Sequence, residues 1–208
     1  MLEHAARGVP WLVLLVGFAP LPVLLRIVEE WPYTMWPLQG IAVGLLAGLA
    51  VWCFDEPAAA VVDTLPRGLA WRTAARAVGL VLLLAGWLLS VHWTSAAYFG
   101  KPGHVAWQGV SAVLAGTAWA TWRRSQGIAL PARPAATALV CGASYLALAR
   151  PLENLLPFFP YRADGPWTTS AVVWAVVAVA SVSLLCVLLA ETRWARPLRA
   201  EQQTRRPG

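Results

Sequence analysis

Six long apolar runs, separated by short polar segments, follow one another along the chain. Each run is close to the roughly 20 residues that an α-helix needs to cross a bilayer core about 30 Å thick. We therefore expect an all-α, polytopic membrane protein with six transmembrane helices. The predicted spans are Val9–Val28, Thr34–Phe54, Arg76–Ser95, Val105–Trp122, Ala135–Ala149 and Thr168–Ala190.

The first predicted span contains Pro20 and Pro22, which should kink it because each removes a helix hydrogen bond. We expect this span to remain a transmembrane helix rather than to be a cleavable signal peptide. Its apolar run is long, and Arg26, Glu29 and Glu30 follow it in place of a small-residue cleavage site.

The composition supports a membrane location. Of the 208 residues, 59% are hydrophobic and only 12% are charged, whereas a typical soluble domain has about 25% charged residues. This scarcity of charge excludes a soluble globular enzyme, a disordered chain and a nucleic-acid-binding domain. We expect no nucleic-acid partner, although the net charge is +6.

The positions of the basic residues explain that net charge as a topology signal. Of the 16 Lys and Arg residues, 12 lie in the flanks that share one side of the membrane with the amino terminus. Cytoplasmic loops hold such an excess, so both termini are predicted to be cytoplasmic. Residues 1–193 are predicted to form the six-helix domain, and 194–208 a basic cytoplasmic tail, either solvated or in contact with membrane lipids.

Small residues recur at a spacing of four in three predicted spans. Gly40, Gly44 and Gly48 form a flat face along the second span, and the pattern is repeated in the fourth by Ala112, Gly116 and Ala120 and in the fifth by Ala138 and Gly142. Close backbone approach drives helix association in lipid. The pattern therefore predicts helix packing at these residues, either within one chain or between two.

Catalytic motifs are missing from the sequence. It has no phosphate-binding loop of the form G-x-x-x-x-G-K-[ST] and no H-E-x-x-H, G-x-S-x-G or C-x-x-C motif. We therefore expect no catalytic, cofactor or metal site in this chain. No acidic residue lies in the middle of a span, which disfavours ion-coupled transport.

His92 and His104 flank one predicted outer loop. Two histidines can ligate a haem iron, so one alternative is a membrane redox subunit that binds haem or quinone. Ordinary polar residues at the membrane interface are the other interpretation. A visible absorption spectrum distinguishes the haem hypothesis, because bound haem gives a Soret band.

The predicted inner loop between the second and third spans has the most specific pattern. Asp55 is a suitable N-cap, and Glu56 and Pro57 suit a first helical turn. An apolar stripe follows at Ala58, Val61, Val62 and Leu65. These features predict a short amphipathic helix at the cytoplasmic surface, which either lies on lipid or docks to a cytosolic partner.

This loop resembles that of permease subunits of actinobacterial ATP-binding-cassette (ABC) exporters of the type-two class. The resemblance lies in Phe54-Asp55-Glu56-Pro57-Ala58-Ala59-Ala60, followed by Thr64-Leu65-Pro66 and Trp71-Arg72. It implies a non-enzymatic export subunit of a bacterial plasma membrane. The aromatic and aliphatic walls of the spans, which carry no fixed charge, predict a hydrophobic or amphiphilic substrate. A cytosolic ABC ATPase would bind ATP and Mg, and a second six-helix permease, the same or a related chain, would pair with this one.

The resemblance also assigns roles to individual residues. The inner loop would be the coupling helix that contacts the ATPase, through Asp55, Glu56, Asp63, Thr64 and Arg67. An apolar re-entrant segment would lie on the outer side between the fifth and sixth spans, at Arg150, Glu153, Phe158 and Phe159. The short fifth span and the apolar run after it agree with such a segment. A non-catalytic membrane scaffold is the remaining alternative.

Overall fold

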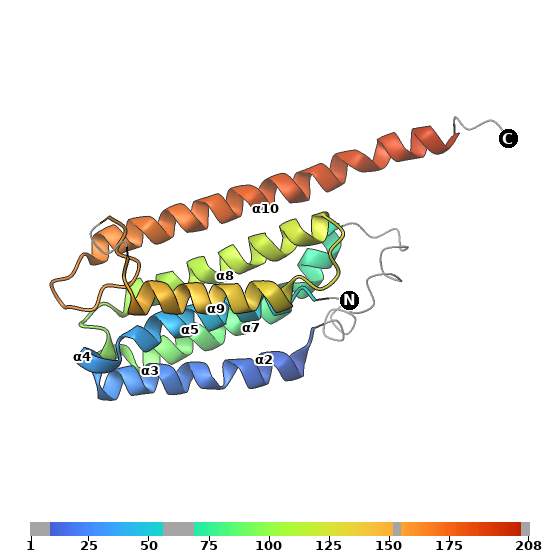
Figure 1. Ribbon diagram of the computed structural model, residues 1–208. Helices are drawn as coiled ribbons and strands as arrows, with labels where there is room; N and C mark the ends of the chain where they lie inside the picture. Colours follow the sequence, from blue (N-terminus) through green and yellow to red (C-terminus); the bar gives the residue numbers. More distant parts are fainter. Residues whose placement is uncertain (1–8, 56–68, 152–154, 205–208) are drawn as a thin grey trace.

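The structure is a computed structural model that describes residues 9–55, 69–151 and 155–204. These residues fold into helices that run alongside one another, with no strand in the described part (Figure 1). In chain order the elements are α2 (Trp11–Phe18), α3 (Pro20–Glu30), α4 (Pro32–Met35), α5 (Pro37–Trp52), α7 (Leu69–Trp93), the 3-10 helix η1 (Ser95–Ala97), α8 (Pro102–Ser125), α9 (Ala132–Leu148) and α10 (Trp167–Thr204).

Three helical stretches are long and apolar enough to cross a membrane. They are Trp11–Glu30, Thr73–Trp93 and Trp167–Ala190. Much of their apolar surface is exposed, including Leu12 and Leu15 of α2 and Val172, Val176 and Val179 of α10. A bilayer is the solvent that such surfaces require, so the chain is a membrane-helical protein.

The remaining three predicted spans correspond to α5, α8 and α9. Helices α5 and α9 have only 16 and 17 residues, which is short of a full bilayer crossing. Helix α8 has 24 residues but carries buried polar side chains, among them Gln108, Ser111 and Thr121. Membrane crossing by these three helices remains a prediction.

Proline determines several of the element boundaries. The first predicted span is divided into α2 and α3 at Ala19, immediately before Pro20. The second predicted span, Thr34–Phe54, begins within the short helix α4, and Pro37 begins the separate helix α5. Proline lacks the amide hydrogen that a continuing helix would donate, but it fits a first helical turn.

Helix α5 lies at the centre of the bundle and packs against both α9 and α8. A Cβ atom at Gly40 would lie 2.5 Å from the Ala147 Cβ atom, and one at Gly44 would lie 2.6 Å from the Ala143 Cβ atom. The glycine face of α5, which ends at Gly48, is therefore turned toward α9 within the same chain.

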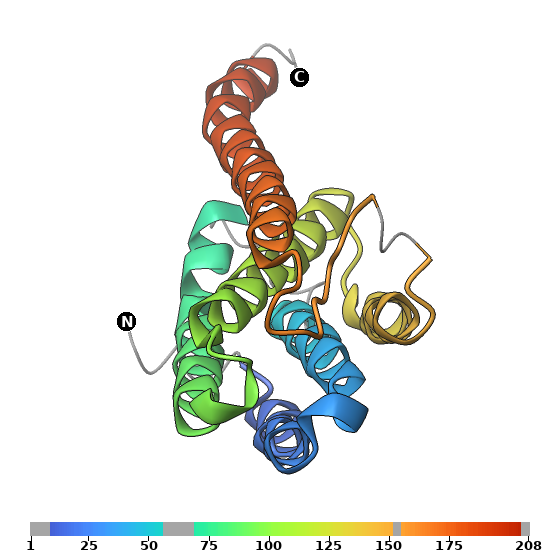
Figure 2. The same cartoon turned by 90° about the vertical axis from the view of Figure 1, so that its left-hand side faces the viewer.

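Helix α8 approaches α5 through its own small residues. A Cβ atom at Gly116 would lie 2.5 Å from the Ala47 carbonyl oxygen, and Ala112 is buried. On its other side α8 packs against α10. The view along the bundle shows α10 beside α8 and apart from α9 (Figure 2).

Candidate functional site

The segment that connects α9 to α10 lies over one end of the bundle. We call residues 155–166 the cap segment; it contains no helix. Helix α9 ends shortly before it, and Arg150 has a left-handed backbone with φ of 47°. Such a residue commonly terminates a helix, although glycine is usual there. The sequence placed an apolar re-entrant segment in this region, and its described part is irregular rather than helical.

The backbone carbonyl of Phe158 fixes the cap segment to the bundle. It accepts hydrogen bonds from Ser170 Oγ at 3.0 Å and Trp174 Nε1 at 3.0 Å, both on α10. It also accepts one from Gln108 Nε2 of α8 at 3.3 Å. Irregular backbone within a membrane protein needs such internal partners, because lipid offers none.

A buried pair of glutamines extends this network to α5. Gln39 Nε2 donates to Gln108 Oε1 at 2.7 Å, and the two residues are only 4% and 1% exposed. Because an unpaired amide in an apolar interior costs free energy, this pairing favours one relative placement of α5 and α8. Three helices are thus connected to the carbonyl of one cap residue, Phe158.

Aromatic rings hold Arg150 at the edge of the cap segment. Its guanidinium carbon lies 4.5 Å from the Trp36 ring centroid and 4.2 Å from that of Tyr161. Arg162 approaches the same Tyr161 ring at 5.0 Å. Cation–π attraction of this kind is worth about 0.5–1 kcal/mol at exposed sites and more when water is excluded.

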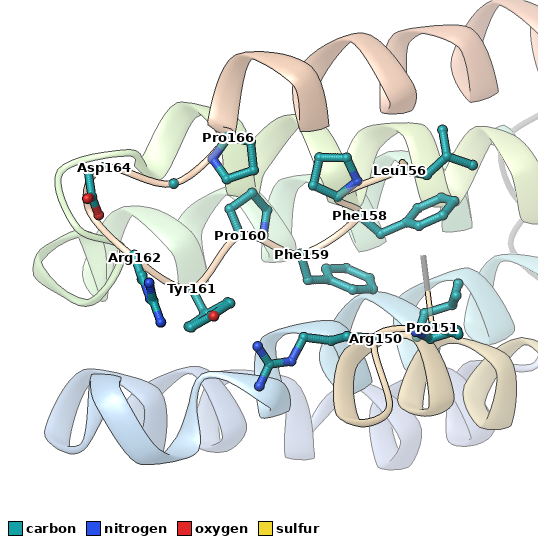
Figure 3. Close-up of a pocket in the computed structure, with 13 residues that line it drawn as sticks. Arg150, Pro151, Leu156, Phe158, Phe159, Pro160, Tyr161, Arg162, Asp164 and Pro166 are labelled. Carbon is teal, nitrogen blue, oxygen red and sulfur yellow. The ribbon is translucent and has the colours of Figure 1, made fainter. Parts of the chain in front are cut away.

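A cavity of about 240 Å³ lies beside these groups (Figure 3). We call it the cap cavity. Its lining combines the two arginines and Asp164 with apolar side chains of the cap segment, including Leu156 and Phe159. It can therefore accommodate a molecule that has both a charged and an apolar part.

A second space, of about 270 Å³, opens between α5, α8, α9 and α10. We call it the lateral groove; its lining is almost entirely apolar and has no charged residue. Leu146, Phe158 and Phe159 line both the lateral groove and the cap cavity. The two chambers, the charged cap cavity and the apolar lateral groove, therefore adjoin each other at these three side chains.

At the opposite end of the bundle, side chains connect the ends of three helices. The Asp55 carboxylate accepts a hydrogen bond from the Ala132 backbone amide at 2.9 Å. Arg76 Nη1 of α7 donates to the carbonyl oxygens of Cys53 at 3.0 Å and Asp55 at 3.3 Å. We call this set the three-helix joint, because it connects the end of α5 to α7 and to the start of α9.

Burial raises the pKa of the Asp55 carboxyl. The Ala132 amide and the charges of Arg133, Arg124 and Arg76 act in the opposite direction, but the loss of water around the carboxyl outweighs them. The sequence suggested Asp55 as an N-cap of the following loop and as a partner contact. That loop lies outside the described residues; within them the Asp55 side chain is buried and caps the first turn of α9.

Several predicted site residues lie outside the described part of the chain. These are Glu56, Asp63, Thr64 and Arg67 of the inner loop and Glu153 of the outer segment. The predicted coupling-type helix between the second and third spans falls in the same undescribed region. The partner contacts assigned to these residues stay predictions.

The histidine pair has a simple environment. His92 lies exposed at the end of α7, and the His104 ring packs edge-on against Trp167 with 5.8 Å between ring centroids. Across residues 9–55, 69–151 and 155–204, no cluster of three or more His, Cys, Asp or Glu side chains is arranged to hold a metal ion.

Sequence analysis did not identify Gln39, Gln108 and Ser170 as site residues. Their signal was available, since a buried amide within an apolar helix needs a partner. The partners of Gln108 are, however, 50 to 69 residues away, and one of them is a backbone oxygen. Comparisons of the chain with protein-family models, with curated proteins and with solved structures found no match.

Proposed function

We propose that this chain is the transmembrane permease subunit of an ABC-type exporter in a bacterial plasma membrane. It would move a hydrophobic or amphiphilic substrate, and a separate cytosolic ATPase would bind ATP and Mg and supply the energy. In this proposal six helical segments span the membrane, with α2 and α3 counted as one, and both termini are cytoplasmic. A second six-helix chain completes the pathway.

The three-helix joint is the single observation that carries the proposal. The inner loop, residues 56–68, follows Asp55 in the sequence, and the side chains of Asp55 and Arg76 connect α5, α7 and α9 at this point. A partner that pushes on this loop would act on three helices together. That is the arrangement a passive permease needs if another protein drives it.

The contacts of α5 extend the effect of such a push to the other end of the bundle. Helix α5 packs closely against α9 and α8, and Gln39 near its far end pairs with Gln108 beneath the cap segment. A displacement of α5 would thus reach the cap segment. The energy of the change would come from nucleotide contacts that differ between two states of the partner ATPase.

The lateral groove supports the proposed class of substrate. Its apolar lining has no charged residue, and Phe158 and Phe159 of the cap segment line it on the side away from the three-helix joint. A substrate with a hydrophobic part would enter such a groove at little cost in desolvation.

The proposal is tested by isolating the tagged chain from its native cell in mild detergent and assaying the eluate for ATPase activity. We expect an ATPase with a phosphate-binding loop to co-purify. We expect Glu56→Arg combined with Asp63→Arg to reduce its recovery at least several-fold, because both changes invert charges in the inner loop.

Lys101→Glu is the matched control, since it inverts an exposed charge at the cap end of the bundle. It should leave recovery of the ATPase unchanged. The proposal is wrong if the intact chain is recovered without any ATPase and cellular export of amphiphilic dyes is unaffected by the double inner-loop variant.

A further inference from the structure

The cap cavity and the lateral groove together form one amphiphilic site. They meet at Leu146, Phe158 and Phe159, which line both. The cavity side presents arginines, while the groove side presents only apolar and small residues of α5, α8, α9 and α10. A ligand that fills both must carry a polar group at one end and a hydrocarbon chain at the other.

The charge on the cavity side favours an anion. Arg150 and Arg162 both approach the ring of Tyr161, at 4.2 Å and 5.0 Å, so two like charges share a small region. Asp164 is the one acidic residue among the described lining residues. An anionic group placed here would reduce the repulsion between the guanidinium groups and accept their hydrogen bonds.

We propose that this site binds a single anionic lipid. Its headgroup lies in the cap cavity against Arg162 and Arg150, and its acyl chain lies in the lateral groove between α9 and α10. Basic pockets between membrane helices recognise anionic headgroups in this way. The inference depends on the chain lying in a membrane and not on the export activity proposed above.

The groove has room for the chain at a specific point. Gly142 of α9 lines it, and a Cβ atom at this position would meet no other atom within 4 Å. The glycines of α5 differ, because a Cβ atom at Gly40 or Gly44 would collide with α9. Gly142 is thus a lining position of the groove at which an added Cβ atom does not disturb helix packing, and a larger side chain there would narrow the groove.

The test is a binding titration of the purified full-length chain in non-ionic detergent, read by native mass spectrometry. The probes are phosphatidylglycerol, phosphatidylcholine with the same acyl chains, and glycerol phosphate. We expect phosphatidylglycerol to bind about tenfold more tightly than phosphatidylcholine, the factor that one charge-assisted hydrogen bond supplies. We expect glycerol phosphate to compete only weakly.

Two pairs of variants separate the headgroup from the chain. Arg162→Gln should abolish most of the preference for phosphatidylglycerol, whereas Lys101→Gln, a cation outside the cavity lining, should preserve it. Gly142→Leu should weaken binding of both lipids at least several-fold and leave their ratio unchanged. Gly142→Ala is its control and should bind both lipids as the unaltered chain does.

The proposal is overturned by equal binding of the two lipids, by an unchanged preference in Arg162→Gln, or by Gly142→Leu binding both lipids normally. Competition by glycerol phosphate as strong as that by phosphatidylglycerol also overturns it, because the site would then recognise a free anion. None of these results bears on recovery of an ATPase, so this proposal and the proposed export function fail independently.

Discussion

The carboxylate of Asp55 accepts a hydrogen bond from the backbone amide of Ala132, a residue 77 positions further along the chain. The first amides of a helix have no partner within it, and Pro131, which precedes α9, offers no capping side chain. Asp55 therefore supplies from the end of α5 the cap that α9 lacks.

Replacement of Asp55 by alanine should destabilise the fold. It leaves the Ala132 amide unsatisfied, at a cost of about 1 kcal/mol. Asp55→Asn keeps an acceptor oxygen and should cost less. Thermal unfolding in detergent compares the two variants, and equal losses would show that the cap contributes nothing.

The stability difference between the unaltered chain and Asp55→Asn should depend on pH. Because burial raises the pKa of Asp55, the folded state holds this proton more tightly than the unfolded state, whose pKa is about 3.9. The resulting stabilisation is complete below the unfolded pKa and is lost as pH rises through the folded pKa. Between about pH 4 and about pH 7, the melting temperature of the unaltered chain should therefore fall relative to that of Asp55→Asn. A rise relative to that variant contradicts the prediction.

The Gln39–Gln108 pair should show strong coupling. Gln108→Leu leaves the buried Gln39 amide without its acceptor and should cost about 1–3 kcal/mol. Adding Gln39→Leu should recover part of this loss, because both polar partners are then replaced by apolar side chains. A double-mutant cycle from unfolding measurements checks this, and additive losses would mean that the pair does not interact.

Glycine replacements should have opposite effects at two positions. A Cβ atom at Gly109 would overlap the indole of Trp87, which is fully buried, so Gly109→Ala should destabilise the fold by about 1–3 kcal/mol. Gly142→Ala meets no neighbour and should be neutral or stabilising by up to about 1 kcal/mol. Similar melting temperatures for the two variants would contradict the packing of α7 against α8.

Arg150 combines an unfavourable backbone conformation with favourable stacking. Arg150→Ala keeps the left-handed backbone and loses the contacts with Trp36 and Tyr161. Arg150→Gly loses the same contacts but tolerates the backbone, so it should be more stable than the alanine variant by about 1 kcal/mol. Unfolding measurements on both variants test this order, and the reverse order would exclude a left-handed Arg150.

The positions of the main helices were predictable from apolar patterning, because burial in lipid acts on each long run separately. Pro20 likewise indicated where the first helix is interrupted. The start of α7 at Leu69, seven residues before the predicted Arg76, was not predictable. The helix includes the polar flank around Arg72, and an apolar pattern cannot indicate a helix in a polar segment.

The hydrogen bonds that hold the cap segment could not be predicted from the sequence, for a different reason. The apolar run around Phe158 and Phe159 indicated a segment at membrane depth, but its principal acceptor is a backbone oxygen, an atom that every residue has. Asp55 shows the same limit. Its type indicated a helix cap, yet only the folded chain brings the start of α9 to it.

Because a main-chain oxygen fixes the cap segment, these hydrogen bonds do not depend on which side chain stands at position 158. Ser170, Trp174 and Gln108 would still find their acceptor if Phe158 became smaller or more polar. The side chains that line the two chambers therefore differ from the groups that hold the cap segment in place. Substitutions at Phe158 should therefore change the shape of both chambers while the hydrogen bonds to the cap segment are retained.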